Sequence, residues 1–278
     1  MARPHHVHHA SVHLALIAFT AFLLFPLLWV LSTSFKSTPE IYRGTPSFLP
    51  AAVSLEHYQT LLHGGSLLLS IRNSTIVGLL ATVLVVIVAM PGAYALTRFR
   101  SALNKTILSW ILTSQIFPAI LIMIPLYVTL RNLKLTDSLL GLALVYVVWS
   151  LPFVLWMLHG YLKNIPVDLE EAAALDGAST RQIIFRVILP TLLPALGAAA
   201  LFTFISAWNE FFFALVLMKS PAAVTMPVEL ARYTGMEGQA RTGPLAAASV
   251  LATLPSLVLF GAMQKWFASG LLSGAVKD

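Results

Sequence analysis

The chain has 278 residues, of which 58% are hydrophobic and only 10% are charged. A soluble globular domain typically carries about 25% charged residues, so most of this chain is expected to lie in lipid. Its net charge of +6 comes from cations scattered thinly between apolar segments, which indicates positions near anionic lipid rather than nucleic-acid binding. The chain has no cysteine, which excludes disulfides and thiolate metal sites.

Long stretches without Asp, Glu, Lys or Arg divide the chain, and six of them exceed the roughly 20 residues that a helix needs to cross a bilayer. Backbone groups in lipid must be satisfied internally, so each stretch is expected to be helical. The first is too long for the apolar core of a signal peptide and is interpreted as a retained span. The predicted fold is an all-α membrane protein, one transmembrane domain over 1–278, with spans at about 13–33, 74–97, 106–130, 138–160, 191–217 and 245–264.

An even number of spans places both termini and the loop 161–190 on one side of the membrane. Lys and Arg residues are almost evenly divided between the two sides, so the positive-inside rule barely decides the orientation; Arg98, Arg100 and Lys105, in a short loop on the side of the termini, weakly favour cytoplasmic termini. Prolines inside the spans can mark mobile, kinked helices around a pathway, although membrane helices also tolerate proline without such a role. These prolines are Pro26, Pro91, Pro118, Pro125, Pro152, Pro194 and Pro255.

The most polar loop follows the fourth predicted span and has the pattern of two short helices joined by a turn. Asp168 can cap the first helix with Glu171 three positions on, and the alanines that follow are strong helix formers that let another surface approach the backbone closely. Gly177 is expected to stop this helix in the left-handed conformation. Ser179 and Gln182 form a second capping box. The residues alone leave two interpretations open: a surface on which a soluble protein acts, or a hairpin that lies on the bilayer without such a role.

Several fixed spacings in this loop resemble the EAA motif of ABC importer permeases. The motif begins with Glu-Ala-Ala at 171–173, continues with Gly177 and ends with Leu189-Pro190, while Val187 stands where the family has Ile. Further segments resemble the carbohydrate-uptake branch, and within it the maltose and trehalose permease subunits with six spans. These segments are Phe35-Lys36, Asn73-Ser74, Ala-Trp-Asn-Glu at 207–210 and Gly-Leu-Leu-Ser-Gly-Ala-Val-Lys at 270–277.

The resemblance implies six transmembrane helices of the ABC importer permease type with a cytoplasmic coupling helix hairpin. In the family, the first helix of this hairpin docks in a cleft of a cytoplasmic ATPase, so Glu171 is expected to pair with a basic residue there. The resemblance also implies that the loop 161–190 and both termini are cytoplasmic, in the inner membrane of a prokaryotic cell. The residues expected to couple to the ATPase are Glu170, Glu171, Ala172, Ala173, Leu175, Asp176, Gly177, Leu189 and Pro190.

The implied function is that of a permease subunit of an ATP-driven importer for maltose, trehalose or a related oligosaccharide. The chain has no Gly-x-x-x-x-Gly-Lys-Ser/Thr phosphate loop, so ATP and Mg are expected on a partner ATPase homodimer. The other expected partners are a second permease subunit, an extracytoplasmic sugar-binding protein and the lipid bilayer, with no nucleic acid. No catalytic, cofactor-binding or metal-binding residue is assigned, and the chain is not expected to be an enzyme.

One acid lies inside a predicted span. Glu210, with Trp208 and Asn209 beside it, could line a sugar pathway, because sugars pack on aromatic faces and bond to amides and carboxylates. A structural hydrogen bond between helices is the alternative, and Gln115 in the third span has the same two interpretations.

Both ends of the chain carry weaker signals. The N-terminal histidines could bind metal, but a solvated tail near the membrane surface is the preferred interpretation. The segment 270–277 could contact the ATPase, with a frayed terminus as the alternative. The histidines are His5, His6, His8, His9 and His13.

Other functions remain as alternatives. An ion-coupled secondary transporter often shows inverted repeats and buried ionisable groups, whereas this chain shows no such repeat and one clear buried acid. An ABC importer permease for a non-sugar solute is a further alternative. An intramembrane enzyme lacks a convincing set of ligands or nucleophiles, because most histidines lie in the N-terminal segment.

Overall fold

The computed structural model describes residues 5–99, 101–235 and 241–275, with side chains from 11 to 264 apart from the same gaps. Every regular element in these ranges is a helix. The molecule divides into two compact units, one formed by 1–68 and 229–254 and the other by 69–228 and 255–278. Three helices each have residues in both units: α4 (Ser66–Arg98), α12 (Met226–Arg232) and α13 (Thr242–Ala275).

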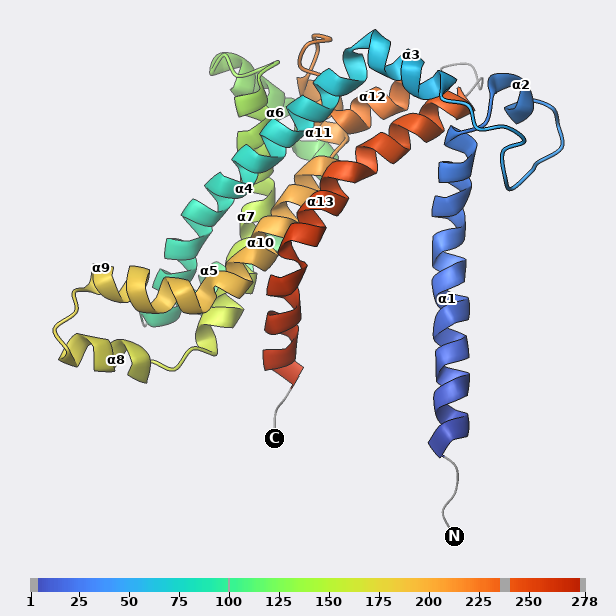
Figure 1. Cartoon of the computed structure of the whole chain (residues 1–278). Coiled ribbons are helices and arrows are strands. Elements are labelled where there is room, and N and C mark those ends of the chain that lie inside the picture. The colour runs from blue at the N-terminus through green and yellow to red at the C-terminus, as the bar shows by residue number, and fades with distance from the viewer. Residues whose placement is uncertain (1–4, 100, 236–240, 276–278) are drawn as a thin grey trace. The chain divides into compact units, whose positions relative to one another are not determined.

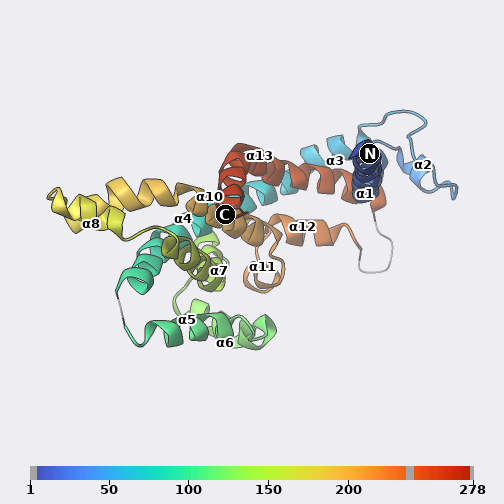
Figure 2. The same ribbon diagram turned by 90° about the horizontal axis from the view of Figure 1, so that it is seen from below.

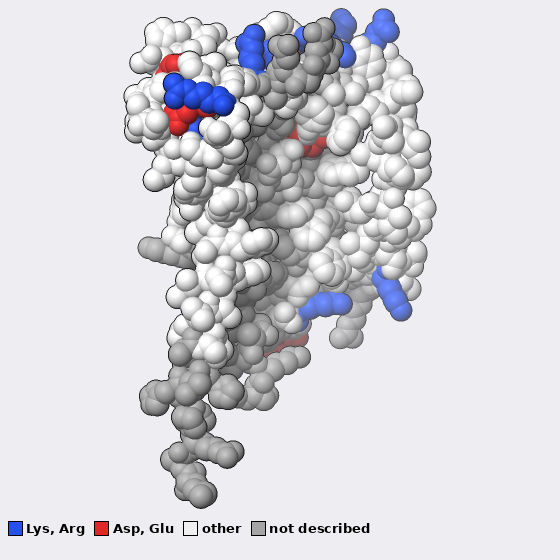
Figure 3. Space-filling view, turned by 90° about the vertical axis from the view of Figure 1, so that its right-hand side faces the viewer, with Lys and Arg blue, Asp and Glu red and all other residues white. Residues whose placement is uncertain are grey.

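The first unit begins with α1 (His5–Ser34), which contains no Asp, Glu, Lys or Arg. Its described apolar side chains are mostly exposed, as expected for a helix that is hydrophobic all round and faces lipid. Figure 3 shows this uncharged surface below the charged segment that follows α1. In that segment Lys36 donates to the carbonyl of Ser47 and lies 5.0 Å from the ring of Trp29. Lys36 therefore ties the following loop back to the end of α1.

The polar contacts of the first unit continue through α2 (Thr38–Ile41) and α3 (Glu56–Gly64). Glu56 Oε1 accepts hydrogen bonds of 2.6 Å from both the hydroxyl and the backbone N–H of Thr38, and these bonds hold the pKa of Glu56 below its usual range. His57 is buried against α13, where a Cβ at position 243 would lie 2.1 Å from its Nε2. Gly243 is therefore the residue that this close packing requires.

The second unit packs around α4. Five short or β-branched residues of α4, spaced four apart, lie on one helix face and are buried. Short side chains allow membrane helices to approach closely. Next to it, α7 (Leu139–Lys163) and α10 (Leu189–Asn209) lie side by side in extensive contact (Figures 1 and 2). The buried row on α4 consists of Val77, Ala81, Val85, Ala89 and Ala93.

Five described helices are long and apolar enough to cross a membrane, and a sixth crossing requires a bent pair. The segment 106–130, expected as one span, consists of α5 (Asn104–Ser114) and α6 (Ala119–Asn132), which are bent by 95°. Pro118 accounts for this break, because it has no N–H to donate and its extended backbone (ψ 124°) precedes α6. The five long helices are Ser11–Ser34, Ser66–Arg98, Leu139–Lys163, Thr180–Asn209 and Thr242–Gln264.

The segment 191–217 is also not one helix. α10 ends at Asn209, Glu210 has an extended backbone (ψ 126°), and the chain resumes as α11 (Phe212–Leu217). On the other side, α9 (Thr180–Ile183) and the π-helical turn η1 (Ile184–Ile188) run directly into α10. The second helix of the polar loop is therefore the first part of a continuous helix of 30 residues that ends at Asn209.

Candidate functional site

The polar loop forms a helical hairpin in which α8 (Asp168–Leu175) lies along α9 and η1 (Figure 1). The expected capping role of Asp168 is wrong: α8 begins at Asp168 itself, and Val167 precedes it without a side-chain cap. Asp168, Glu170 and Glu171 instead place three carboxylates in the first turn. Negative charge at a helix N-terminus is favourable, because the backbone N–H groups there carry partial positive charge.

The turn between the two helices has the expected local geometry. Gly177 has φ +84°, a left-handed conformation, and its N–H donates to the carbonyl of Ala174 at 3.0 Å. Ala178 N–H donates to the carbonyl of Ala173 at 3.0 Å, which satisfies a second carbonyl at the end of α8. The capping box is confirmed, because Ser179 N–H donates to Gln182 Oε1 at 2.8 Å and Ser179 Oγ accepts from Gln182 N–H.

The outer surface of the hairpin is formed by small and apolar groups next to acids. Ala172 and Ala174 are exposed, and Leu175 is 88% exposed. Glu171 and Asp176 are exposed as well, whereas Ala173 is half-buried and packs on the core of the second unit. These exposed alanines leave the backbone of α8 accessible from outside, with Leu175 and two carboxylates beside it.

Glu170 differs from its neighbour Glu171 because it points into the molecule. Its Oε1 lies 2.5 Å from Nε of Arg98, and its Oε2 accepts a hydrogen bond of 2.8 Å from the hydroxyl of Tyr94. Arg98 and Tyr94 were not among the predicted site residues. Tyr94 and Arg98 are four positions apart near the end of a span and so share one helix face, but this spacing does not indicate Glu170 as their partner.

The last two residues of the motif lie away from α8. Leu189 is half-buried at the start of α10, and Pro190 is exposed in the first turn of that helix. The π-helical turn η1 directly precedes Pro190 within the continuous helix, and this departure from the regular α-helical hydrogen bonds suits proline, which has no N–H to donate. Leu189 and Pro190 thus belong to the span that the hairpin leads into, and not to the surface around Glu171.

The residues expected to line a pathway make internal contacts. Glu210 accepts from the hydroxyl of Tyr146 at 2.8 Å and from the backbone N–H groups of Phe213 at 3.0 Å and Ala214 at 3.2 Å. Trp208 is 4% exposed and stacks on Phe204. These contacts match the structural interpretation of Glu210, since they join α7 to the start of α11.

The two pathway candidates with amide side chains also bond within the chain. Asn209 Nδ2 donates to the carbonyl of Ile205 in its own helix at 2.9 Å, and its side chain is otherwise exposed. Gln115 Nε2 donates to the carbonyl of Trp149 at 3.3 Å, beside the break between α5 and α6.

A second acid holds the chain beyond the α10–α11 break. Asp137, in the loop between α6 and α7, has φ +56° and accepts through Oδ1 from the backbone N–H groups of Lys219 at 2.8 Å and Ser220 at 3.0 Å. Partial burial raises the pKa of Asp137, but the hydrogen bonds from Ser220 and Lys219 outweigh it, so that the pKa lies below its usual range.

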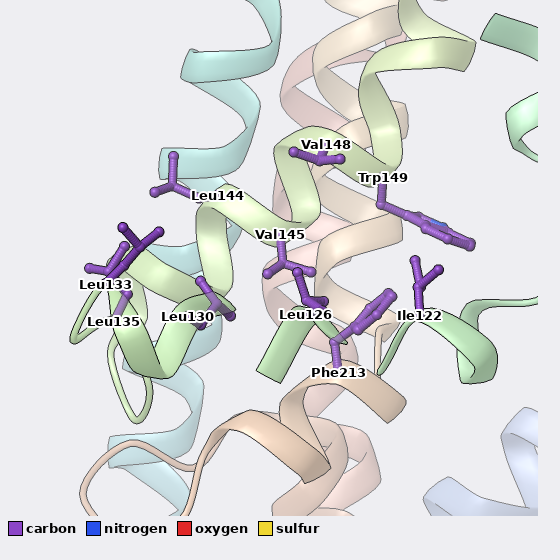
Figure 4. Close-up of a pocket in the computed structure, with 10 residues that line it drawn as sticks. All are labelled: Ile122, Leu126, Leu130, Leu133, Leu135, Leu144, Val145, Val148, Trp149 and Phe213. Carbon is purple, nitrogen blue, oxygen red and sulfur yellow. The ribbon is translucent and has the colours of Figure 1, made fainter. Parts of the chain in front are cut away.

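The second unit contains an apolar cavity of about 180 Å³ between α6, α7 and α11 (Figure 4). Trp149 and Phe213 lie at one end of it, and the other lining side chains are aliphatic. It offers few groups that could bond to a sugar, and none of the four predicted pathway residues lines it.

Within the described residues, no group of three or more His, Asp or Glu could hold a metal ion. The side chains of His5, His6, His8 and His9, and those of 270–277, lie outside the described set.

Comparison with known proteins places these features in a family. Over residues 82–273 the chain matches the family described as binding-protein-dependent transport system inner membrane component. The chain belongs to this family. The matched residues include the whole hairpin and the α10–α11 break, so the resemblance to ABC importer permeases that the EAA spacing indicated is confirmed.

Several relatives of this inner membrane component match over most of their length. A putative ABC transporter permease protein ORF1 of Streptomyces antibioticus is 50% identical over 206 residues, which are 74% of this chain and 90% of the relative. The trehalose transport system permease protein SugB of Mycobacterium tuberculosis is 35% identical over 92% of this chain and 93% of its own.

A solved structure agrees with the fold. It belongs to a bacterial ABC transporter involved in the import of the acidic polysaccharide alginate, and one of its chains is similar to this chain with a TM-score of 0.81 and 26% identity. The match covers 96% of this chain and 99% of that chain. The fold is therefore the all-α membrane architecture of ABC importer permeases.

Proposed function

We propose that this chain is the membrane-spanning permease subunit of an ATP-driven ABC importer for a sugar, with maltose, trehalose or a related oligosaccharide as the substrate. The observation that carries this proposal is the similarity, along 92% of the chain, to a permease named for trehalose transport. The similar alginate importer supports carbohydrate as the class of substrate. The chain catalyses no bond chemistry in this proposal, because ATP and Mg bind to a partner ATPase homodimer.

The hairpin supplies the surface on which that ATPase acts. The exposed alanines of α8 allow a partner cleft to approach the helix backbone, Leu175 offers an apolar contact, and Glu171 offers a charge for a basic residue. A ligand shifts an equilibrium only through a difference in affinity for two states. ATP binds elsewhere, so its effect on the spans must pass through a contact of this kind.

The same proposal assigns the remaining partners and the orientation. The hairpin and both termini lie in the cytoplasm of a prokaryotic cell, and the chain lies in its inner membrane. A second permease subunit completes the pathway, and an extracytoplasmic sugar-binding protein delivers the sugar. Cysteines introduced at exposed positions of α8 test the orientation, since the chain has none of its own. Labelling by an impermeant reagent only after the membrane is opened is the expected result.

The function is tested with the purified complex in liposomes that contain ATP on the hairpin side. Uptake of labelled trehalose or maltose that requires both ATP and the binding protein is expected. Uptake that follows a proton or sodium gradient without ATP would show an ion-coupled secondary transporter instead. ATP-dependent uptake of a non-sugar solute alone would keep the permease role and refute the sugar.

A further inference from the structure

Three side chains join the start of α8 to the end of α4. Arg98 Nε lies 2.5 Å from Glu170 Oε1, and Arg98 Nη2 donates to the carbonyl of Ile165 at 2.9 Å. Tyr94 donates to the second oxygen of Glu170 at 2.8 Å. Both carboxylate oxygens and two guanidinium nitrogens thus have partners. We call Arg98, Glu170 and Tyr94 the α4–α8 joint.

The joint is largely withdrawn from solvent. The side chains of Arg98 and Glu170 are 11% and 12% exposed. An ion pair in such surroundings is weakly screened, and the loss of one partner leaves the other charge buried and unpaired, which is strongly unfavourable. Each charge also suits its helix end, because Arg98 is in the last turn of α4 and Glu170 in the first turn of α8.

The α4 side of the joint is itself anchored. Asn104 Nδ2 donates to the carbonyls of Leu96 at 3.0 Å and Phe99 at 2.6 Å, which satisfies groups at the end of α4. Thr97, next to Arg98, shares a hydrogen bond of 2.8 Å with Nδ1 of His159 on α7. The end of α4 is therefore fixed to its surroundings, so that a displacement of Glu170 acts on a rigid element.

The geometry points to a second, non-covalent route by which movement of α8 reaches the membrane helices. The first route is the chain itself, through α9 and η1 into α10. The second is the α4–α8 joint, in which Glu170 is a positioning residue that carries movement of α8 to α4 and not a residue that docks to the ATPase. This inference rests on the proposed function, and it divides the two adjacent acids: Glu171 faces the partner and Glu170 faces the spans.

The main test measures sugar taken up per ATP hydrolysed by the purified complex in liposomes. Glu170→Gln and Arg98→Gln are each expected to lower this ratio by about tenfold, since each leaves an unpaired polar group in the joint. Tyr94→Phe removes one hydrogen bond and is expected to have a smaller effect. A matched control removes one charge from an exposed side chain nearby: Lys105→Gln in the first turn of α5. This control is expected to stay within about twofold of the unmodified complex.

A charge exchange separates transmission from simple destabilisation. Arg98→Glu combined with Glu170→Arg restores opposite charges across the joint, although each charge then opposes the dipole of its helix. The double variant is expected to recover part of the sugar taken up per ATP hydrolysed, to a ratio above that of Arg98→Glu or Glu170→Arg alone. Single variants that couple normally would overturn the inference. The inference would also be overturned if Arg98→Glu, Glu170→Arg and the double variant all lost the same share of uptake per ATP while their melting temperatures stayed unchanged.

A distance measurement tests the joint without sugar or ATP. Spin labels on Val88→Cys in α4 and Ala174→Cys in α8 report the separation of the two helices in the full chain in nanodiscs. A narrow distribution that broadens in Glu170→Gln, but not in Asp168→Asn, is expected. An equally narrow distribution in Glu170→Gln would overturn the joint. If the unmodified complex moves sugar without ATP, the proposed function fails, and this distance measurement alone decides whether the joint exists.

Discussion

Two regions of the second unit present acids in opposite ways. At the α10–α11 break, Glu210 has its hydrogen-bonding capacity met by Tyr146 and by two backbone N–H groups. In the hairpin, Glu171 is exposed on α8, next to the exposed side chains of Ala172 and Ala174. The chain itself supplies partners for Glu210, whereas Glu171 is exposed beside alanines and is open to a partner. The following predictions test this contrast.

The largest effect is expected from Glu210→Ala. It leaves the hydroxyl of Tyr146 and the N–H groups of Phe213 and Ala214 without an acceptor, and each such group costs about 1–3 kcal/mol. A lower melting temperature of the purified complex and a lower yield in the membrane are expected. Glu210→Gln keeps an acceptor and is the control. Lost uptake at an unchanged melting temperature in Glu210→Ala would instead assign Glu210 to the sugar pathway.

Glu171→Lys is expected to lower uptake without lowering the melting temperature, unlike Glu210→Ala. The side chain is exposed, so the melting temperature should stay unchanged. Uptake should fall by about tenfold or more while ATPase activity no longer responds to the sugar-loaded binding protein, because attraction to a basic partner becomes repulsion. Glu171→Gln should lose less. Normal uptake by Glu171→Lys would show that this acid is not a docking residue.

Gly177→Val tests the turn between the helices. Its φ of +84° costs a non-glycine residue about 1–2 kcal/mol, and no atom lies within 4 Å of the added Cβ, so the effect is one of backbone conformation alone. A several-fold loss of coupled uptake is expected. Gly177→Asn is the matched control, because asparagine tolerates this conformation better. Equal activity of both variants would show that the turn adapts without cost.

The smallest effect is expected at Asp137, which contacts the end of α11 and the two residues beyond Met218. Its carboxyl pKa is lower in the folded chain than in the unfolded chain, so the ionised form adds stability above about pH 4, and this stability is lost as pH falls through the folded value. The melting temperature of the unmodified protein should fall below about pH 4, partly because Asp137 becomes protonated. In Asp137→Asn this fall should be smaller, because the contribution of Asp137 is absent. An unchanged pH profile would mean that the hydrogen bonds to Lys219 and Ser220 contribute little.

Local features of the hairpin could be predicted from the sequence. The left-handed Gly177 and the capping box of Ser179 and Gln182 depend on residues within a few positions of each other, so sequence spacing determines them. The helical membrane spans could be predicted from the apolar stretches for the same reason, because the backbone hydrogen bonds of a helix join residues that are close in sequence. The coupling role assigned to Glu171 remains a prediction that came from family resemblance.

Features that depend on distant residues could not be predicted. Arg98 and Glu170 are 72 positions apart, and no pattern in either segment indicates that they meet. Glu170 was therefore grouped with Glu171, although only one of them is exposed. The break at Pro118 had a visible signal in the proline itself, but the composition of 106–130 is that of one uninterrupted span. A length criterion cannot recognise a bend of 95°.

The unbroken helix from Thr180 to Asn209 has a mechanical consequence. With 30 residues and a rise of about 1.5 Å per residue, it is about 45 Å long. A tilt of about 5° around one end would displace the other sideways by about 4 Å, which is less than the pitch of about 5.4 Å of one helical turn. The hairpin lies at one end of this helix and Glu210 follows the other, so the proposed action of an ATPase on the hairpin would move the α10–α11 break by several ångströms for a tilt of a few degrees.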